Sequence, residues 1–249
     1  MLRSWILAVA LVFGVVLDAQ AQALPRASTP EDVGLSSERL KRLSAAMSAA
    51  VDRREIPGAV VIIGRKGKVA YAESFGFRDR EAGSPMRPDA IHRIASMTKP
   101  IASLAIMMLV EEGRLNLTDP VAMHLPELKD VKVGMEKKND SGTVELTLED
   151  PQRAMTVHDL LRHTSGLTYG FFGKSLVKER YNAAKVMDPG QTSAQFVTKL
   201  AGLPLQYHPG TTWEYSVSTD VLGRIIEVVS GVPLDTFIAE RLTRPLKMR

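Results

Sequence analysis

Ser96 and Lys99 are the residues whose types and spacing best fit nucleophilic chemistry, in the stretch SMTK that stands before an apolar run from Ile101 to Val110. If that run is a helix that begins near Ser96, residues i and i+3 share a face, so the Lys99 amine lies beside the Ser96 oxygen. Pro100 fits this position, because the first helical turn tolerates a missing N–H group. The sequence predicts a serine nucleophile with a lysine base at a buried helix start.

A second Ser-x-x-Lys motif, from Ser175 to Lys178, shows how easily chance supplies this pattern. Charged residues surround it, with Lys174 before and Glu179 and Arg180 after, and no apolar run follows. We expect Lys178 to lie in solvent, where a lysine amine is a cation and not a base. We therefore interpret this motif as a chance copy.

Residues 1–23 carry the pattern of a secretory signal peptide. Arg3 precedes an apolar stretch from Trp5 to Leu17, and alanines then recur at every second position to Ala23. About 13 apolar residues are too few for a bilayer, which needs roughly 20. We predict cleavage after Ala21 or Ala23, export to the periplasm or the medium, and no stable membrane anchor after cleavage.

Composition excludes several functional classes. The formal net charge is +4 without a block of like charges, which argues against a nucleic-acid partner. The chain has no cysteine, so disulfides, a cysteine nucleophile and thiolate zinc sites are excluded. The histidines lack metal-ligand spacing, and the sequence holds neither a glycine-rich nucleotide loop nor a Gly-x-Ser-x-Gly elbow. We expect no metal and no organic cofactor.

Hydrophobic periodicity places a helix and the first sheet strands in residues 24–93 and a mainly helical region in residues 94–249. The helix follows Ser36 and ends near Arg54, and a hairpin joins strands 58–63 and 68–75. In the helical region, the helix 101–112 is apolar almost all round, so we expect it to be central and buried. A capping box opens a second helix, 156–162, and Ser218 or Thr219 caps a third, 218–230. The polar stretch from Asp130 to Arg153 is interpreted as an exposed insertion.

Two strands do not make a stable sheet. An isolated hairpin is marginal in water, and the apolar run from Val60 to Ile63 calls for further strands as neighbours. Nothing after Glu149 has the pattern of a strand. We therefore expect that later sheet strands are missing and that the domain formed by residues 24–249 is incomplete at its C-terminus.

Three stretches together resemble the serine β-lactamases and penicillin-binding-protein-like hydrolases, especially family VIII carboxylesterases and class C β-lactamases. They are the residues 94–99 (IASMTK), 160–167 (LLRHTSGL) and 208–217 (HPGTTWEYSV). The resemblance runs from about Leu35 to Met248. It implies an α+β fold of the β-lactamase/transpeptidase type, in which an antiparallel sheet flanked by helices meets a helical domain at the active site.

The resemblance also implies roles for three residues. Ser96 corresponds to the nucleophile that forms an acyl-enzyme, Lys99 to the proton acceptor beside it, and Tyr215 to the catalytic tyrosine. A serine hydroxyl becomes a good nucleophile only when a neighbouring base takes its proton. A desolvated lysine, or a phenol near cations, can serve as that base.

Two departures from the family pattern bear on the substrate. Val217 stands where the lactamases of this group carry an asparagine, which favours an esterase over a lactamase. The family's later Lys-Thr-Gly-like segment, whose strand completes the oxyanion hole, does not occur. The first hypothesis is a carboxylesterase, the second a β-lactamase or D-alanyl-D-alanine carboxypeptidase, and the third a catalytically impaired fragment or ligand-binding module. The small-molecule partner is accordingly an ester or a lactam, and the oligomeric state stays open.

Other candidate residues have simpler interpretations. His163 and Ser165 lie in a helix end and turn, and we interpret them as structural. Met107 and Met108 are expected to fill the core. Three aromatic residues either line an acyl pocket or only cover the helical region, and the sequence does not decide between these: Tyr169, Phe171 and Phe172.

Overall fold

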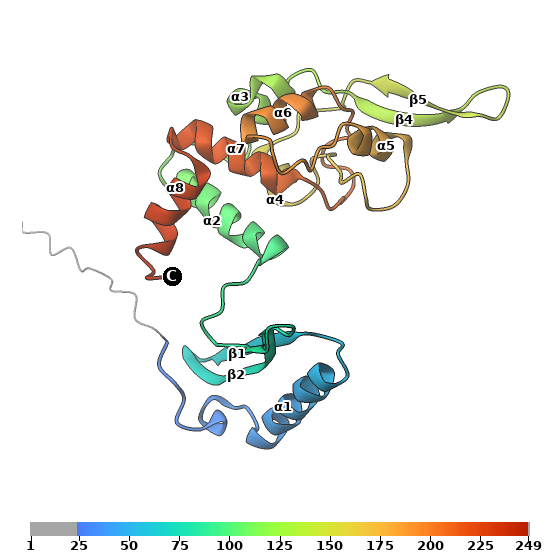
Figure 1. The fold of residues 1–249 in the computed structure, drawn as a ribbon. Helices are drawn as coiled ribbons and strands as arrows, with labels where there is room; N and C mark the ends of the chain where they lie inside the picture. Colours follow the sequence, from blue (N-terminus) through green and yellow to red (C-terminus); the bar gives the residue numbers. More distant parts are fainter. Residues whose placement is uncertain (1–23, 249) are drawn as a thin grey trace, which may run out of the picture. The chain divides into compact units, whose positions relative to one another are not determined.

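A computed structural model describes residues 24–248 of the chain (Figure 1). The predicted signal peptide lies outside the described residues. The chain divides into two compact units, Met1–Arg93 and Ile94–Arg249, and each is described by itself.

The first unit is one helix on a small antiparallel sheet. The 3₁₀ turn η1 (Pro30–Val33) precedes helix α1 (Ser37–Asp52), which is followed by the strands β1 (Gly58–Arg65), β2 (Lys68–Asp79) and β3 (Ser84–Pro85). The strands are ordered β1-β2-β3, and both pairings are antiparallel. The predicted hairpin is therefore confirmed, and the loop expected after it contains the short strand β3.

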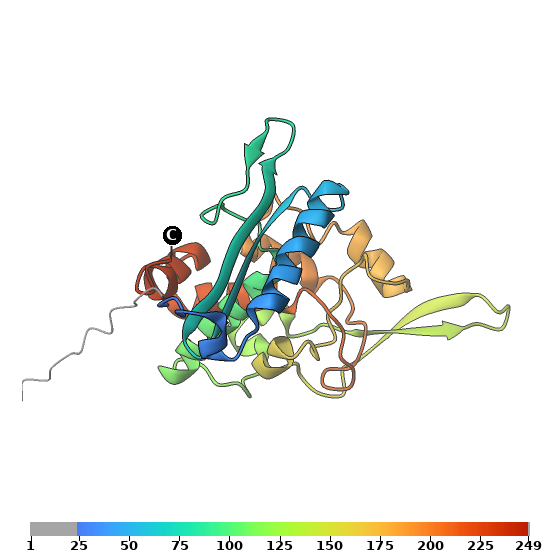
Figure 2. The same cartoon turned by 90° about the horizontal axis from the view of Figure 1, so that it is seen from below.

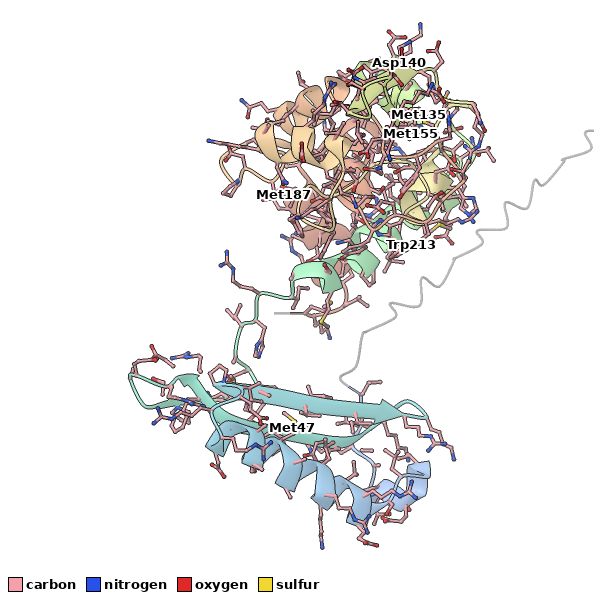
Figure 3. The ribbon with its side chains drawn as sticks, turned by 90° about the vertical axis from the view of Figure 1, so that its right-hand side faces the viewer. Met47, Met135, Asp140, Met155, Met187 and Trp213 are labelled. Carbon is pink, nitrogen blue, oxygen red and sulfur yellow. The ribbon has the colours of Figure 1, made fainter. Side chains whose placement is uncertain are left out.

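Local sequence explains both parts of this unit. The Ser36 side chain caps α1 by accepting a hydrogen bond from the Arg39 N–H. Met47 of the apolar helix face packs against the sheet residues Tyr71 and Phe75 (Figure 3). Lys66 and Gly67 both have positive φ angles, 50° and 70°, as a tight two-residue hairpin turn requires.

The second unit is mainly helical. Its helices are α2 (Thr98–Glu111), α3 (Val121–His124), α4 (Val157–Leu161), α5 (Leu176–Ala183), α6 (Ser193–Ala201), α7 (Ser218–Ser230) and α8 (Leu234–Ile238). Short helical turns complete it: η2 (Ala95–Met97), η3 (Pro126–Leu128) and η4 (Ala239–Thr243). Its core joins α2, α4 and α7 through Leu109, Leu160 and Ile225, all fully buried.

Within its own unit, helix α2 is buried on one face only. Ile106 and Leu109 lie in the core, whereas Leu104 is 49% and Met107 is 42% exposed. The prediction of a helix buried all round is therefore wrong, and so is the assignment of Met107 to the core. Apolar composition does not distinguish a helix buried on every side from one that buries a single face.

The stretch between Asp130 and Arg153, which we expected to be an exposed insertion, forms a second hairpin. Strands β4 (Val133–Lys138) and β5 (Val144–Glu149) pair antiparallel and project from their unit (Figures 1 and 2). Val133 at its base is fully buried and forms a bridge to Leu205. The alternation of apolar and polar residues in β5 was the available signal, but the charged residues of both strands concealed it.

The caps of α4 and α7 differ in how well the sequence predicted them. Thr156 and Asp159 form the expected capping box of α4. At α7 the cap residue is Val217, and no side chain caps the helix; Ser218 is the first helical residue and is fully buried. Gly231 ends α7 with a φ of 80°, as expected for a C-terminal glycine.

The mixture of helices and antiparallel strands confirms the α+β class. Among residues 24–248, no helix combines the length and apolar character needed to cross a membrane.

Candidate active site

Ser96 lies in a strained turn at the start of α2. It is the middle residue of η2, and α2 begins two residues later. Ala95 before it has a φ of 44°, a left-handed conformation that costs a non-glycine residue about 1–3 kcal/mol. Ser96 is exposed, so the expected buried helix start is wrong for the serine itself. Only the opposite face of α2 enters the core.

The three residues predicted from the sequence meet at the Ser96 oxygen. The Tyr215 hydroxyl donates a hydrogen bond to Ser96 Oγ at 2.6 Å. Lys99 Nζ donates to the same oxygen at 3.3 Å and lies 4.7 Å from the centroid of the Tyr215 ring. A nucleophile candidate, a cation and a phenol thus form one hydrogen-bonded group, although 119 positions separate Tyr215 from Ser96.

Tyr169 is a fourth polar member of this group. Lys99 Nζ donates to its hydroxyl at 3.4 Å. The sequence marked Tyr169 only as a pocket candidate, because the turn that carries it has no periodicity relating it to α2. The available signal was the glycine-rich segment around Tyr169, which is typical of a turn.

The pKa values of Lys99 and Tyr215 are shifted in opposite directions within this group. Burial of its ammonium group lowers the pKa of Lys99, but hydrogen bonds and charge interactions with Tyr215 and Tyr169 outweigh burial and raise the pKa overall. Hydrogen bonds to Lys99 and Ser96 lower the pKa of the Tyr215 phenol. The proton therefore stays on Lys99 more readily, and leaves Tyr215 more readily, than in free amino acids.

A cavity of about 550 Å³ opens beside Lys99. Its wall comes from η2 and the start of α2, from the segment before α6 and α6 itself, and from α7 and α8. It includes Ala95, Thr98, Met187, Phe196, Asp220 and Leu234. Burial raises the pKa of the Asp220 carboxyl, while the charge of Lys99 opposes this rise. The sequence did not single out Asp220, although its position five residues after Tyr215, in the first turn of α7, was a possible signal.

Aromatic rings surround Tyr215. Ring centroids lie 5.4 Å from Tyr215 to Tyr169, 5.9 Å to Phe172 and 6.2 Å to Trp213, and Phe171 follows at 4.5 Å from Phe172. Phe171 and Phe172 are exposed, and so is Trp213, which is labelled in Figure 3. We call Tyr215 and the four rings around it, Tyr169, Phe171, Phe172 and Trp213, the aromatic wall. Exposed rings beside a candidate nucleophile can bind an apolar part of a substrate.

Other residues singled out in the sequence lie outside this group. Ser165 is fully buried and bonds to the Ser218 hydroxyl at 2.8 Å, so it does not pair with His163. Val217 is also fully buried. No cluster of histidine, aspartate and glutamate side chains within residues 24–248 could hold a metal ion.

The second Ser-x-x-Lys motif is structural, but not for the expected reason. Ser175 caps α5 by accepting from the Lys178 N–H at 3.1 Å. Lys178 does not lie in solvent: its ammonium pairs with Glu214 at 2.8 Å, and both side chains are largely buried. Among the described residues, no hydrogen bond joins Ser175 or Lys178 to Ser96, Lys99 or Tyr215, although Lys178 pairs with the residue before Tyr215.

Comparison with known proteins identifies relatives of the chain. A family model described as Beta-lactamase matches residues 43–249. The chain is 36% identical over 210 residues to "Esterase EstB" of Burkholderia gladioli, covering 84% of the chain and 50% of that protein. It is 32% identical over 201 residues to "Lovastatin esterase" of Penicillium rubens, covering 80% of the chain and 49% of that protein.

Solved structures give the same grouping. "EstCE1, a hydrolase with promiscuous acyltransferase activity" superposes with a TM-score of 0.72 at 31% identity, covering 84% of the chain and 52% of the other. The chain therefore spans about half the length of the curated relatives it matches.

Proposed function

Because the chain belongs to the beta-lactamase family, we propose that it supplies the nucleophile of a serine hydrolase that cleaves carboxylic esters through an acyl-enzyme on Ser96. One observation carries the proposal: the hydroxyl of Tyr215 lies 2.6 Å from Ser96 Oγ while Lys99 contacts both side chains. The relatives named as esterases support the choice of reaction.

In the first half of the reaction, Tyr215 acts as the base. In its phenolate form, stabilised by the Lys99 cation, Tyr215 takes the Ser96 proton as Ser96 Oγ bonds to the ester carbonyl carbon. The tetrahedral oxyanion collapses, the carbon–oxygen bond to the alcohol breaks, and the alcohol leaves with the proton from Tyr215. The acyl group remains on Ser96.

Water reverses these steps in the second half. It gives a proton to Tyr215 and attacks the acyl carbon, and the proton returns to Ser96 as the acid departs. An alcohol in place of water would give acyl transfer by the same steps. Throughout, Lys99 keeps its proton, in agreement with its raised pKa.

We propose short-chain esters rather than lactams as substrates. Val217 stands at the position where the resemblance to class C β-lactamases implies an asparagine, and its side chain is apolar and fully buried. It offers no hydrogen bond to the amide of a lactam substrate. Dominant turnover of a chromogenic cephalosporin over p-nitrophenyl acetate would reverse this choice.

Active-site labelling tests the nucleophile directly. An alkyl fluorophosphonate should attach to Ser96, as read by peptide mass spectrometry, in the parent chain and in Ser175→Ala. Ser96→Ala should show no label and should lose p-nitrophenyl acetate hydrolysis. A Ser96→Ala variant that hydrolyses the ester at the parental rate contradicts the proposal.

We also propose export, supported by the sequence pattern of residues 1–23. Expression of the full chain in a Gram-negative host should yield a periplasmic protein whose N-terminal sequence begins at Gln22 or Leu24. A cytoplasmic product that still begins at Met1 argues against export.

A further inference from the structure

The backbone on both sides of Tyr215 is held by one residue, His163. The Glu214 N–H donates to the His163 carbonyl at 2.9 Å, and the Ser216 N–H donates to His163 Nδ1 at 3.3 Å. The residue between these two amides is the one whose phenol reaches Ser96. The imidazole also packs beside the Tyr215 ring, with centroids 5.0 Å apart.

The hydrogen bond from Ser216 fixes the form of the imidazole. Because Nδ1 accepts from a backbone N–H, the proton of the neutral ring lies on Nε2. Burial and the charge of Lys99 both lower the pKa of His163. The neutral ring is therefore the form that holds Ser216 near neutral pH.

Three buried hydroxyls extend this contact into the core. Ser216 Oγ lies 2.7 Å from Ser218 Oγ, which lies 2.8 Å from Ser165 Oγ. All three serines are 0% exposed. Ser165 Oγ also accepts from the Leu167 N–H at 3.2 Å. This row of three hydroxyls thus connects the turn after α4 to the first residue of α7.

The turn conformation aims His163 at this segment. His163 has a φ of 57°, left-handed although it is not glycine. Gly166, also left-handed, allows the turn to pass close to another segment, because a Cβ there would lie 2.1 Å from the Tyr207 oxygen. A left-handed residue outside glycine persists where its surroundings hold it.

We propose that His163 is a positioning residue for Tyr215: it holds residues 214–216 so that the phenol reaches Ser96, and the buried serines hold Ser216 in turn. His163 contacts no reacting atom in this scheme. The inference rests on the proposed function, in which Tyr215 moves the Ser96 proton.

A matched pair of variants tests the acceptor at Nδ1. In His163→Asn, the amide oxygen lies near the position of Nδ1 and can accept the same hydrogen bond, and asparagine tolerates a positive φ. In His163→Leu, the side chain has the same branching but no acceptor. We expect His163→Leu to lower kcat for p-nitrophenyl acetate by about 30- to 100-fold with KM changed by less than about threefold. We expect His163→Asn to stay within about fivefold of the parent. His158→Leu, at an exposed position of α4, is the control.

The Tyr215 phenol supplies a readout that does not need activity. With ¹³Cζ-labelled tyrosine, and with Tyr215→Phe to assign the signal, Tyr215 should titrate below its ordinary pKa in the parent and in His163→Asn. In His163→Leu the titration should move upwards, because the phenol leaves Lys99 and Ser96. If no variant hydrolyses the ester, the proposed function fails, and this titration alone decides the positioning role.

Two results overturn the inference. One is a folded His163→Leu variant with parental kcat and an unchanged Tyr215 titration. If His163→Leu does not fold, as judged by its thermal transition, Ser218→Ala decides: it breaks the hydroxyl chain and should lower kcat about 3- to 10-fold at constant KM. Parental kcat with an unchanged Tyr215 titration in Ser218→Ala is the second overturning result.

Discussion

The chain contains the same four-residue pattern twice, and only one copy has the surroundings that we propose to be catalytic. At Ser96 the lysine ammonium points to the serine oxygen and to two phenols. At Ser175 the hydroxyl is turned to the backbone as a helix cap, and the Lys178 ammonium is paired with Glu214. Identical spacing therefore gives a hydrogen-bonded Ser–Lys–Tyr group in one place and a helix start in the other.

The difference lies in where each serine sits on its helix. Ser175 is the residue before α5, so its oxygen turns back to the third N–H of that helix. Ser96 lies inside a separate turn before α2, and the strained Ala95 precedes it. A serine that satisfies a helix N–H is occupied, whereas Ser96 Oγ is left to Lys99 and Tyr215.

Removing the lysine should separate the two motifs most strongly. We expect Lys99→Met to lower kcat/KM for p-nitrophenyl acetate by about 10²- to 10³-fold, because the cation that stabilises the Tyr215 phenolate is lost. Thermal stability should change little, since Lys99 is only partly buried. Steady-state kinetics and a thermal melt measure both effects.

Lys178→Met is the matched variant in the second motif. It leaves the Glu214 carboxylate without its cation in a largely buried place, which should cost about 1–3 kcal/mol of stability. Its kcat/KM should stay within about tenfold of the parent. If Lys178→Met lost as much activity as Lys99→Met, the distinction between the motifs would be wrong.

The sequence predicted the site better than the surroundings that distinguish the two motifs. The three-motif resemblance to the beta-lactamase family is confirmed. It also named Ser96, Lys99 and Tyr215, which the structure brings together, although their roles remain a proposal. Local patterns were sufficient for the α1 cap, the first hairpin and the α4 capping box, because each depends on residues within a few positions.

Contacts between distant segments were not predictable in this way. The pairing of Lys178 with Glu214 joins α5 to the loop before α7, and no local pattern links them. Tyr169 meets Lys99 across 70 positions for the same reason. The β4–β5 hairpin was missed because polar residues dominate an exposed ribbon, even though its base is buried.

The pH profile of the first motif should respond in opposite directions to two charges near Tyr215. Activity that needs the phenolate rises with pH through the pKa of Tyr215, which Lys99 and Ser96 hold below its ordinary value. Lys99→Met removes the cation and should move this rising limb to higher pH. Asp220 raises the pKa of Tyr215, so Asp220→Asn should move the limb to lower pH.

The measurement is kcat/KM for p-nitrophenyl acetate against pH in the parent and both variants. Ser175→Ala serves as the control and should leave the limb in place. Equal movement of the limb in the same direction for Lys99→Met and Asp220→Asn would show that Tyr215 is not the titrating base.

We expect the aromatic wall to give the first motif a preference for aryl esters. We expect Phe171→Ala and Phe172→Ala to raise KM for phenyl acetate about 3- to 10-fold, with less effect on methyl acetate, because only the aryl ester stacks on the rings. Acid release followed by pH-stat measures both esters. Leu148→Ala, at a similarly exposed apolar residue of β5, is the control. Equal effects on the two esters would remove the wall from substrate binding.

The smallest effect is expected where the second motif loses only its serine. Ser175→Ala should cost about 1 kcal/mol of stability, because the Lys178 N–H loses its cap, and should leave ester hydrolysis within about twofold. Ser175→Asp keeps a capping oxygen but no nucleophilic hydroxyl, so it should retain both stability and activity. Denaturant unfolding and p-nitrophenyl acetate kinetics compare the three proteins. A loss of activity in Ser175→Asp without a loss of stability would mean that the hydroxyl of the second motif has chemistry of its own, and that spacing alone had identified two reactive serines rather than one.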